Sequence, residues 1–241
     1  MPTMAEEAQT YNSPDFVFAA GVPEEVGDTL PARLGVMAPD FAAPTLDGGT
    51  VRLADFRGER YVVLMAGAVT SPMCAFAAPA FDRLQEEFDA LGFSFFFLYT
   101  RESHPAENYG LHTSMEQKTS YAQDLRRLEN IRVPILVDSV DGAIHRSYGP
   151  WPNSLFVIHR DGRLVYRSNM ANTAELRQFL EDLVMGDTLA ERGEMLHTEY
   201  SERLVPHLAD QVTHHRVYER AGPKAFEDYW ARRPDLRDRW P

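Results

Sequence analysis

Apolar residues follow two different periods along the chain, and the periods separate expected strands from expected helices. Residues 61–66 and 93–99 are nearly continuous apolar runs, as expected for strands that are buried on both faces of a sheet. Between these runs, four apolar residues recur at three- and four-residue steps: Phe81, Leu84, Phe88 and Leu91. This spacing predicts a helix with one apolar face that ends at Gly92.

Turn residues and further helical patterns extend this prediction on both sides. Asp47-Gly48-Gly49 predicts the turn of an N-terminal β-hairpin, and Asp161-Gly162 separates two more short strands. Helices are expected over 115–130 and 173–185, with Thr173 as the N-cap of the second helix.

These elements predict an α/β fold in which helices flank a central mixed β-sheet. The N-terminal hairpin is an extension of this core, and the C-terminal part is a helical appendage. We expect three parts: an N-terminal arm over 1–33, the main domain over 34–185, and a C-terminal extension over 186–241.

The net charge and the composition exclude some classes of binding partner. The 241 residues carry a formal net charge of -12 and show no basic stripe, which argues against a nucleic-acid partner. The apolar runs are too short to cross a bilayer, so we expect no membrane partner. The acidic start of the chain, MPTMAEEAQT, does not have the layout of a secretory signal, and we therefore expect a cytoplasmic protein.

Cys74 is the single cysteine of the chain. An intramolecular disulfide and a zinc site built on several thiolates are therefore excluded. A redox cycle would need an external thiol reductant, and we expect neither a metal nor a cofactor.

The C-terminal extension contains four histidines: His197, His207, His214 and His215. Their spacing fits no strong metal-binding motif, which favours a surface role. We expect the extension to pack as an amphipathic cap on the main domain or to form a homo-oligomer contact.

Ser71-Pro72-Met73-Cys74 stands between the first long strand and the helix, in the place of a C-x-x-C motif. Pro79 lies where thioredoxin-like proteins keep a proline within this helix, and residues 38–41 and 160–167 are similar to the flanking elements of peroxiredoxins and TlpA-like redoxins. The chain thus resembles the thioredoxin-like redoxins over residues of about 34–185. The resemblance implies a thioredoxin-like fold.

A narrower resemblance is to the iodothyronine deiodinases of the same superfamily. Residues 67–72 (GAVTSP) are similar to their nucleophile motif, with Ser71 at the position of selenocysteine or cysteine. Residues 99–105 (YTRESHP) are similar to their Tyr-x-x-Glu-x-His-Pro motif. Asn153-Ser154 replaces their Glu-Arg pair. The resemblance implies an oxidoreductase that acts on a small molecule, with an atypical S-x-x-C site.

The physical chemistry of the S-x-x-C segment leaves two interpretations for each of its polar residues. Ser71 before Pro72 is a favoured N-cap that accepts the N–H of Cys74, and it could also contact a ligand. A serine hydroxyl needs a neighbouring base to become a nucleophile. Cys74 has apolar neighbours and is either a small core residue with a raised thiol pKa or the sole redox sulfur.

Glu102 and His104 are expected at the carboxyl end of a strand, the sheet edge at which α/β proteins hold ligands. Two residues apart on an extended segment, they would point to one side, where Glu102 could raise the pKa of His104 and orient it as a general acid or base. The alternative is a solvated loop pair. Thr70 is a candidate for substrate binding or for packing, and Pro152 is a candidate cis-proline that faces the substrate, in competition with Pro150.

Three functions follow from these candidates. The first is a deiodinase-like or redoxin-family oxidoreductase that uses Cys74 of the S-x-x-C site with an external reductant. The second is a non-redox enzyme in which His104, oriented by Glu102, moves protons on a small substrate that Thr70 and Ser71 hold in the same pocket. The third is a non-catalytic binding or scaffold protein.

Overall fold

A five-stranded mixed β-sheet forms the centre of the computed structural model, which describes residues 11–16, 32–149, 151–199 and 210–237. The strand order is β5-β4-β3-β6-β7. The bounds are β3 (Tyr61–Gly67), β4 (Phe93–Tyr99), β5 (Ile135–Val137), β6 (Leu155–Ile158) and β7 (Leu164–Ser168). β3, β4 and β5 are parallel, and β6 is antiparallel to β3 and β7.

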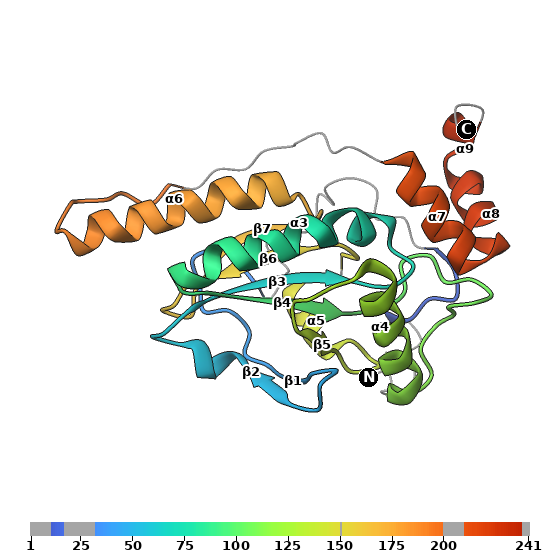
Figure 1. Ribbon diagram of the computed structural model, residues 1–241, viewed down its shortest axis with the longest axis horizontal. Helices are drawn as coiled ribbons and strands as arrows, with labels where there is room; N and C mark the ends of the chain where they lie inside the picture. Colours follow the sequence, from blue (N-terminus) through green and yellow to red (C-terminus); the bar gives the residue numbers. More distant parts are fainter. Residues whose placement is uncertain (1–10, 17–31, 150, 200–209, 238–241) are drawn as a thin grey trace.

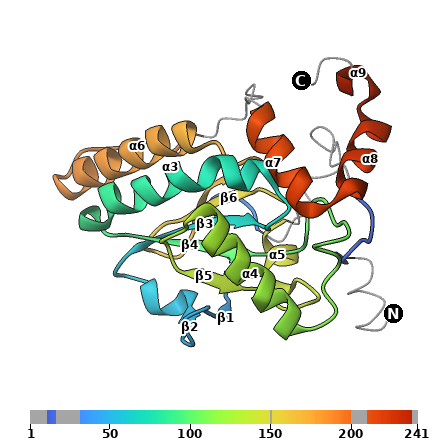
Figure 2. The same ribbon diagram turned by 45° about the vertical axis from the view of Figure 1, so that its right-hand side comes forward.

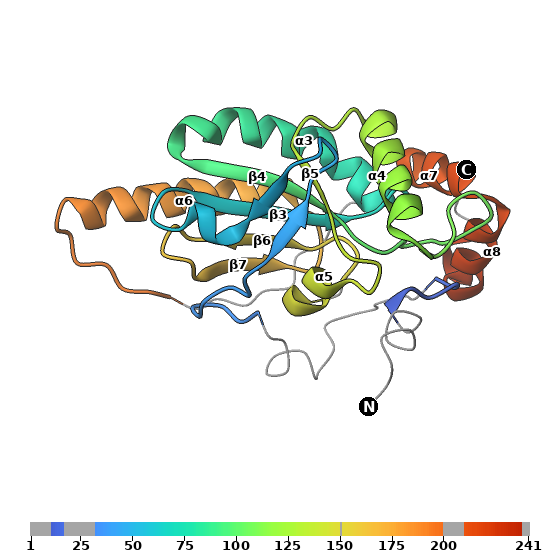
Figure 3. The ribbon, with the colours of Figure 1, turned by 90° about the horizontal axis from the view of Figure 1, so that it is seen from below.

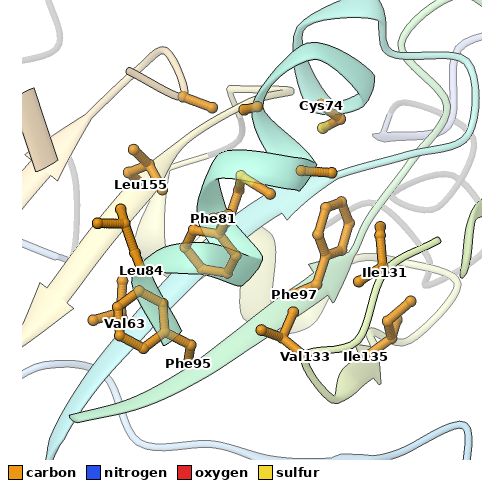
Figure 4. Close-up of a cluster of buried hydrophobic side chains, with 14 of the residues drawn as sticks. Val63, Cys74, Phe81, Leu84, Phe95, Phe97, Ile131, Val133, Ile135 and Leu155 are labelled. Carbon is orange, nitrogen blue, oxygen red and sulfur yellow. The ribbon is translucent and has the colours of Figure 1, made fainter. Parts of the chain in front are cut away.

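One face of the sheet is covered by α3 (Pro72–Phe88), α4 (Met115–Glu129) and α6 (Thr173–Glu191). In Figure 1, α3 and α6 lie side by side above the strands. Because side chains alternate along a strand, Tyr61, Val63 and Met65 of β3 point to this face. They join a large apolar cluster, part of which is shown in Figure 4.

The opposite face is covered by the hairpin of β1 (Ala42–Pro44) and β2 (Thr50–Arg52) and by α5 (Ala143–Tyr148). Figure 3 views the molecule from this side. Val62 and Leu64 of β3 point toward it and pack with residues such as Tyr148. Burial on both faces explains why the β3 run contains no polar residue.

The C-terminal helices α7 (Gln211–Ala221), α8 (Pro223–Arg232) and α9 (Pro234–Arg237) stand at the carboxyl end of the parallel strands (Figure 2). Glu129 at the end of α4 accepts hydrogen bonds from Arg216 at 2.8 and 2.9 Å and from Arg220 at 2.6 Å. A smaller apolar cluster of Phe16, Ala106 and residues of α7 and α8 packs beside this contact. The helical appendage is therefore attached over the edge of the sheet that was predicted to hold the site.

The expected architecture is confirmed: a mixed sheet, flanking helices, an N-terminal hairpin and C-terminal helices. The predicted stop at Gly92 is confirmed: α3 ends at Phe88, a 3-10 turn (Asp89–Leu91) follows, and Gly92 caps this turn in the left-handed conformation, although Leu91 is exposed. The predicted N-cap of α6 is wrong, because the cap is Asn172, whose side chain accepts the N–H of Glu175 at 3.2 Å. Across the described segments of the chain, every helix is too short or too polar to cross a membrane.

Candidate functional site

The turn after β3 presents Ser71 at the start of α3. Its backbone is extended, and its hydroxyl accepts the N–H of Cys74 at 3.2 Å, which confirms the predicted N-cap. Pro72 occupies the first helical position. The Ser71 hydroxyl also donates a hydrogen bond to Oδ1 of Asn153. An amide oxygen is not a base, so the contacts of Ser71 do not make it a nucleophile.

Cys74 lies in the apolar core, as the core interpretation predicted. It has no exposed surface, and Figure 4 shows it in the cluster that also contains Phe81 and Phe97. Its thiol lies 3.3 Å from Oδ1 of Asn153 and 3.6 Å from the carbonyl oxygen of Ala66. Burial raises the pKa of Cys74 to about 12, so the thiol is protonated at neutral pH.

Glu102 is the centre of a buried hydrogen-bond network. One carboxyl oxygen accepts the Thr70 hydroxyl at 2.6 Å and the Thr70 N–H at 3.1 Å. The other accepts the Tyr99 hydroxyl and lies 3.0 Å from Nε2 of His112. These groups come from the ends of β3 and β4 and from the loop that follows β4, so the network joins two parallel strands at their carboxyl edge.

The predicted pairing of Glu102 with His104 is wrong, because the chain bends after β4 and the two side chains diverge. Glu102 pairs with His112, whereas the Nε2 atom of His104 lies 3.5 Å from the Tyr218 hydroxyl. Thr70 links the two positions: its hydroxyl oxygen accepts the backbone N–H groups of Ser103 and His104, both at 3.1 Å. The turn at Thr70 therefore does adjoin the segment 102–104, as expected.

His104 is an uncharged imidazole in an aromatic environment. Its ring stacks on Phe16 with the centroids 4.1 Å apart and contacts Tyr218 and Tyr229. Burial, reinforced by His214, lowers the pKa of His104 to about 3, which is the opposite of the predicted shift. The buried Nδ1 atom has no hydrogen-bond partner among the described residues.

Pro152 does not supply a cis peptide bond: the bond between Trp151 and Pro152 is trans. The residue that faces the S-x-x-C segment is instead the next one, Asn153, which contacts Ser71 and Cys74. Pro150 lies outside the described residues.

Among the C-terminal histidines, the predicted surface role is wrong for His214. It is 6% exposed and packs against the rings of Tyr218 and Tyr229, because α7 turns this side toward the domain. His197 and His215 are exposed, and His207 lies outside the described residues.

His112 was not found from the sequence, because it lies in an irregular loop and pairs with a residue on another element. Asn153 was noted only as a difference from the deiodinases. Tyr99 is the first residue of the Tyr-x-x-Glu-x-His-Pro motif. Its place three residues before Glu102 is the signal that could have predicted the contact between them.

A groove of about 390 Å³ lies along the loop that follows the segment 102–104. It is lined by Pro14, Pro105, Ala106, Glu107, Gly110, Leu111 and Lys224. The predicted site residues do not line it. His104, next to Pro105 in the chain, is separated from solvent by the packing of Phe16 and Tyr218.

A family model described as Redoxin matches residues 33–183. The chain belongs to the redoxin family. The structure has a TM-score of 0.52 to a thiol:disulfide interchange protein DsbE from Chlorobium tepidum, a crystal structure with 22% sequence identity, over 64% of this chain and 99% of that one. This similarity identifies the fold as thioredoxin-like.

The redoxin also has curated relatives among the deiodinases. It is 26% identical over 148 residues to the type I iodothyronine deiodinase of Xenopus laevis, over 58% of each chain. It is 28% identical over 165 residues to the thyroxine 5-deiodinase of Gallus gallus, over 62% of this chain and 63% of that one. The protein thus spans less than two thirds of the length of these relatives, and the deiodinase relationship is distant.

Proposed function

We propose that this redoxin is an enzyme that handles a small molecule at the carboxyl edge of β3 and β4, with proton transfer through the network of Glu102. The single observation that carries the proposal is the arrangement of His112, Glu102 and Thr70. Their polar atoms follow one another at 3.0 and 2.6 Å. Proton transfer requires such hydrogen-bond distances.

The network is costly as a purely structural device. A buried carboxyl group needs several donors to offset its desolvation, and here four donors from Thr70, Tyr99 and His112 converge on it. An apolar group of similar size would fill the same space with less loss of hydration. Buried acid–histidine clusters at a ligand-binding edge are characteristic of functional sites.

The remaining site residues take supporting roles in this proposal. His104, which is uncharged, offers a neutral imidazole to a ligand, and Thr70 positions the 102–104 segment through its hydroxyl oxygen. Cys74 has only a structural role in this proposal. A thiol with a pKa of about 12 has almost no thiolate at neutral pH, and the thiolate is the reactive form. This is the non-redox alternative of the sequence analysis, with His112 in the place of His104 beside Glu102.

A second candidate is thiol chemistry at Cys74. The observation that favours it is the contact of the sulfur with Asn153 at 3.3 Å, directly behind the helix-starting Ser71. Two relatives are named as deiodinases. If the protein removed iodine from a carbon atom, a C–H bond would replace the C–I bond and iodide would leave. The two electrons would come from Cys74 and an external thiol, which would form a mixed disulfide. The site would first have to open.

Untargeted mass spectrometry can separate these functions without a known substrate. The purified protein is incubated with a small-molecule extract, and separately with thyroxine and dithiothreitol, and consumed compounds are identified. We expect wild type and Cys74→Ala to consume the same compound. Glu102→Gln and His112→Asn should reduce the rate at least about 100-fold, the scale of general acid–base catalysis.

The opposite pattern, loss in Cys74→Ala with retention in Glu102→Gln, supports the thiol function. Consumption by none of the proteins supports the binding or scaffold function. Circular dichroism confirms that each variant is folded. The small-molecule substrate, the external thiol reductant, the homo-oligomer and the cytoplasmic location stay predictions.

A further inference from the structure

A short N-terminal segment, residues 11–16, lies across the carboxyl edge of the sheet; we call it the strap. In Figure 2 it is the dark-blue segment beside α8. Only its ends are buried: Tyr11, Asn12 and Phe16 are inside, whereas Pro14 and Asp15 are exposed. The strap therefore contacts the molecule through two separate anchors.

The first anchor is Tyr11, which is 4% exposed. Its hydroxyl forms a 2.5 Å hydrogen bond with Nδ1 of His145, and its carbonyl accepts a 2.9 Å hydrogen bond from Arg101. The ring lies against Gly142, where even a methyl side chain would come within 2.1 Å of it. Asn12 adds a hydrogen bond of 2.5 Å to the carbonyl oxygen of Val140.

The second anchor is Phe16, which covers His104. The two rings are nearly parallel, with an angle of 24° between their planes, and the guanidinium of Arg232 lies 5.6 Å from the centre of the Phe16 ring. The Phe16 ring thus contacts both an imidazole and a guanidinium. A ligand that approached this face of His104 would have to displace it.

The connection between the anchors is weak. Its ion pair joins Asp15 to Lys224 at 3.0 Å, and the Asp15 side chain is 64% exposed. Exposed ion pairs of this kind contribute little to stability. Release of the strap would expose two aromatic rings and break a few hydrogen bonds, without unpairing any strand of the central sheet. Such local opening costs less free energy than unfolding of the domain.

We propose that the strap is an autoinhibitory lid in which Phe16 occupies the position of a ligand on His104. The site opens when the whole strap, with both anchors Tyr11 and Phe16, leaves the molecule's surface as a unit. This inference concerns the regulation of the proposed active site, on whose function the regulatory role rests. The lid itself can be tested without any substrate.

The test measures the modification of single histidines by diethyl pyrocarbonate, which reacts with accessible uncharged imidazoles, by peptide mass spectrometry of the full-length protein. We expect His104 to react slowly in wild type and at least about tenfold faster in Phe16→Ala, since loss of a buried ring removes a large contact. Tyr11→Phe removes the hydrogen bond to His145, at the anchor that does not contact His104, and should accelerate modification of His104 about fivefold, the effect of one hydrogen bond.

Three controls are present in the same experiment. Exposed His197 should react equally in all proteins, and His112, whose side chain has no exposed surface, should stay protected unless the domain unfolds. Phe226→Ala removes a ring from the same cluster, one that contacts Tyr218 and His215, and should leave His104 slow.

Unchanged reactivity of His104 in Phe16→Ala and Tyr11→Phe overturns the lid. Equal acceleration in Phe226→Ala also overturns it, because it would mean that α7 and α8, and not the strap, cover His104. Acceleration in Phe16→Ala alone also overturns it, because the strap would not move as a unit. If His104 is uncovered as expected but no variant consumes any small molecule, the lid stands and the proposed enzymatic function fails.

Discussion

Cys74 packs its sulfur directly against the backbone of Gly67, at the end of β3. A Cβ atom added to Gly67 would lie 1.8 Å from the sulfur of Cys74 and 2.9 Å from the ring of Phe97. The helix start is thus held so close to the strand that its thiol points into the sheet. This contact explains why the sulfur of the S-x-x-C segment is a core atom in the folded protein.

Gly67→Ala should therefore be strongly destabilising. We expect a loss of about 3 kcal/mol or more in the free energy of unfolding, because overpacking of a rigid core forces neighbouring groups to move. Cys74→Ala in the same chain should restore part of this loss, since it removes the closest atom but leaves Phe97. Urea denaturation of both single variants and the double variant measures the coupling.

The matched control is Gly49→Ala, where the added Cβ would meet only the Thr45 hydroxyl at 3.4 Å. It should change stability by less than about 1 kcal/mol. Additive effects of Gly67→Ala and Cys74→Ala would contradict the close contact.

The raised pKa of Cys74 predicts an alkaline loss of stability. The thiol titrates near 8.5 in unfolded chains and at about 12 in the folded protein, so the folded state binds the proton more tightly. This contribution is fully present below pH 8.5 and is lost as the pH rises toward 12. Wild type should lose about 1.4 kcal/mol per pH unit more than Cys74→Ala in this window, measured by urea denaturation. Parallel curves for the two proteins would show that the thiol is not buried.

The cap at Ser71 and the meeting of Thr70 with the segment 102–104 could be predicted from the sequence, whereas the histidine partner of Glu102 could not. Ser71 caps α3 through an atom three residues away, and the order of residues alone fixes that bond. Glu102 has its histidine partner ten residues later in an irregular loop, where no periodicity sets the direction of a side chain.

Phe16 is an extreme case, since it covers a histidine 88 positions away. Only the packing of the strap, the loop after β4 and the C-terminal helices brings them together. The sheet was predictable because burial on both faces leaves a continuous apolar run. The contacts at its carboxyl edge leave no such pattern.

The lowered pKa values of His104 and His145 predict a loss of stability in acid. Burial lowers both to about 3, whereas an unfolded histidine titrates near 6.5, so the unfolded state binds more protons between these values. Their contribution is present above pH 6.5 and is lost as the pH falls toward 3. His104→Asn should reduce the slope of unfolding free energy against pH by about 1.4 kcal/mol per unit. A slope in His104→Asn equal to that of wild type would contradict the burial of this imidazole in the folded protein.

Glu129 anchors the C-terminal helices to α4, and its loss should release them selectively. Its side chain is 5% exposed and accepts hydrogen bonds from Arg216 and Arg220, the second of which is itself largely buried. Glu129→Gln would leave the largely buried guanidinium of Arg220 without its anion, which costs about 3 kcal/mol for a buried pair, whereas the half-exposed Arg216 adds little. We expect faster amide hydrogen exchange in α7, with exchange in β3 and β4 unchanged.

Glu86→Gln, which removes an exposed partner of Arg132, is the control and should leave exchange in α7 as in wild type. Equal acceleration in α7 and β4 would instead mean that the C-terminal helices unfold only together with the sheet.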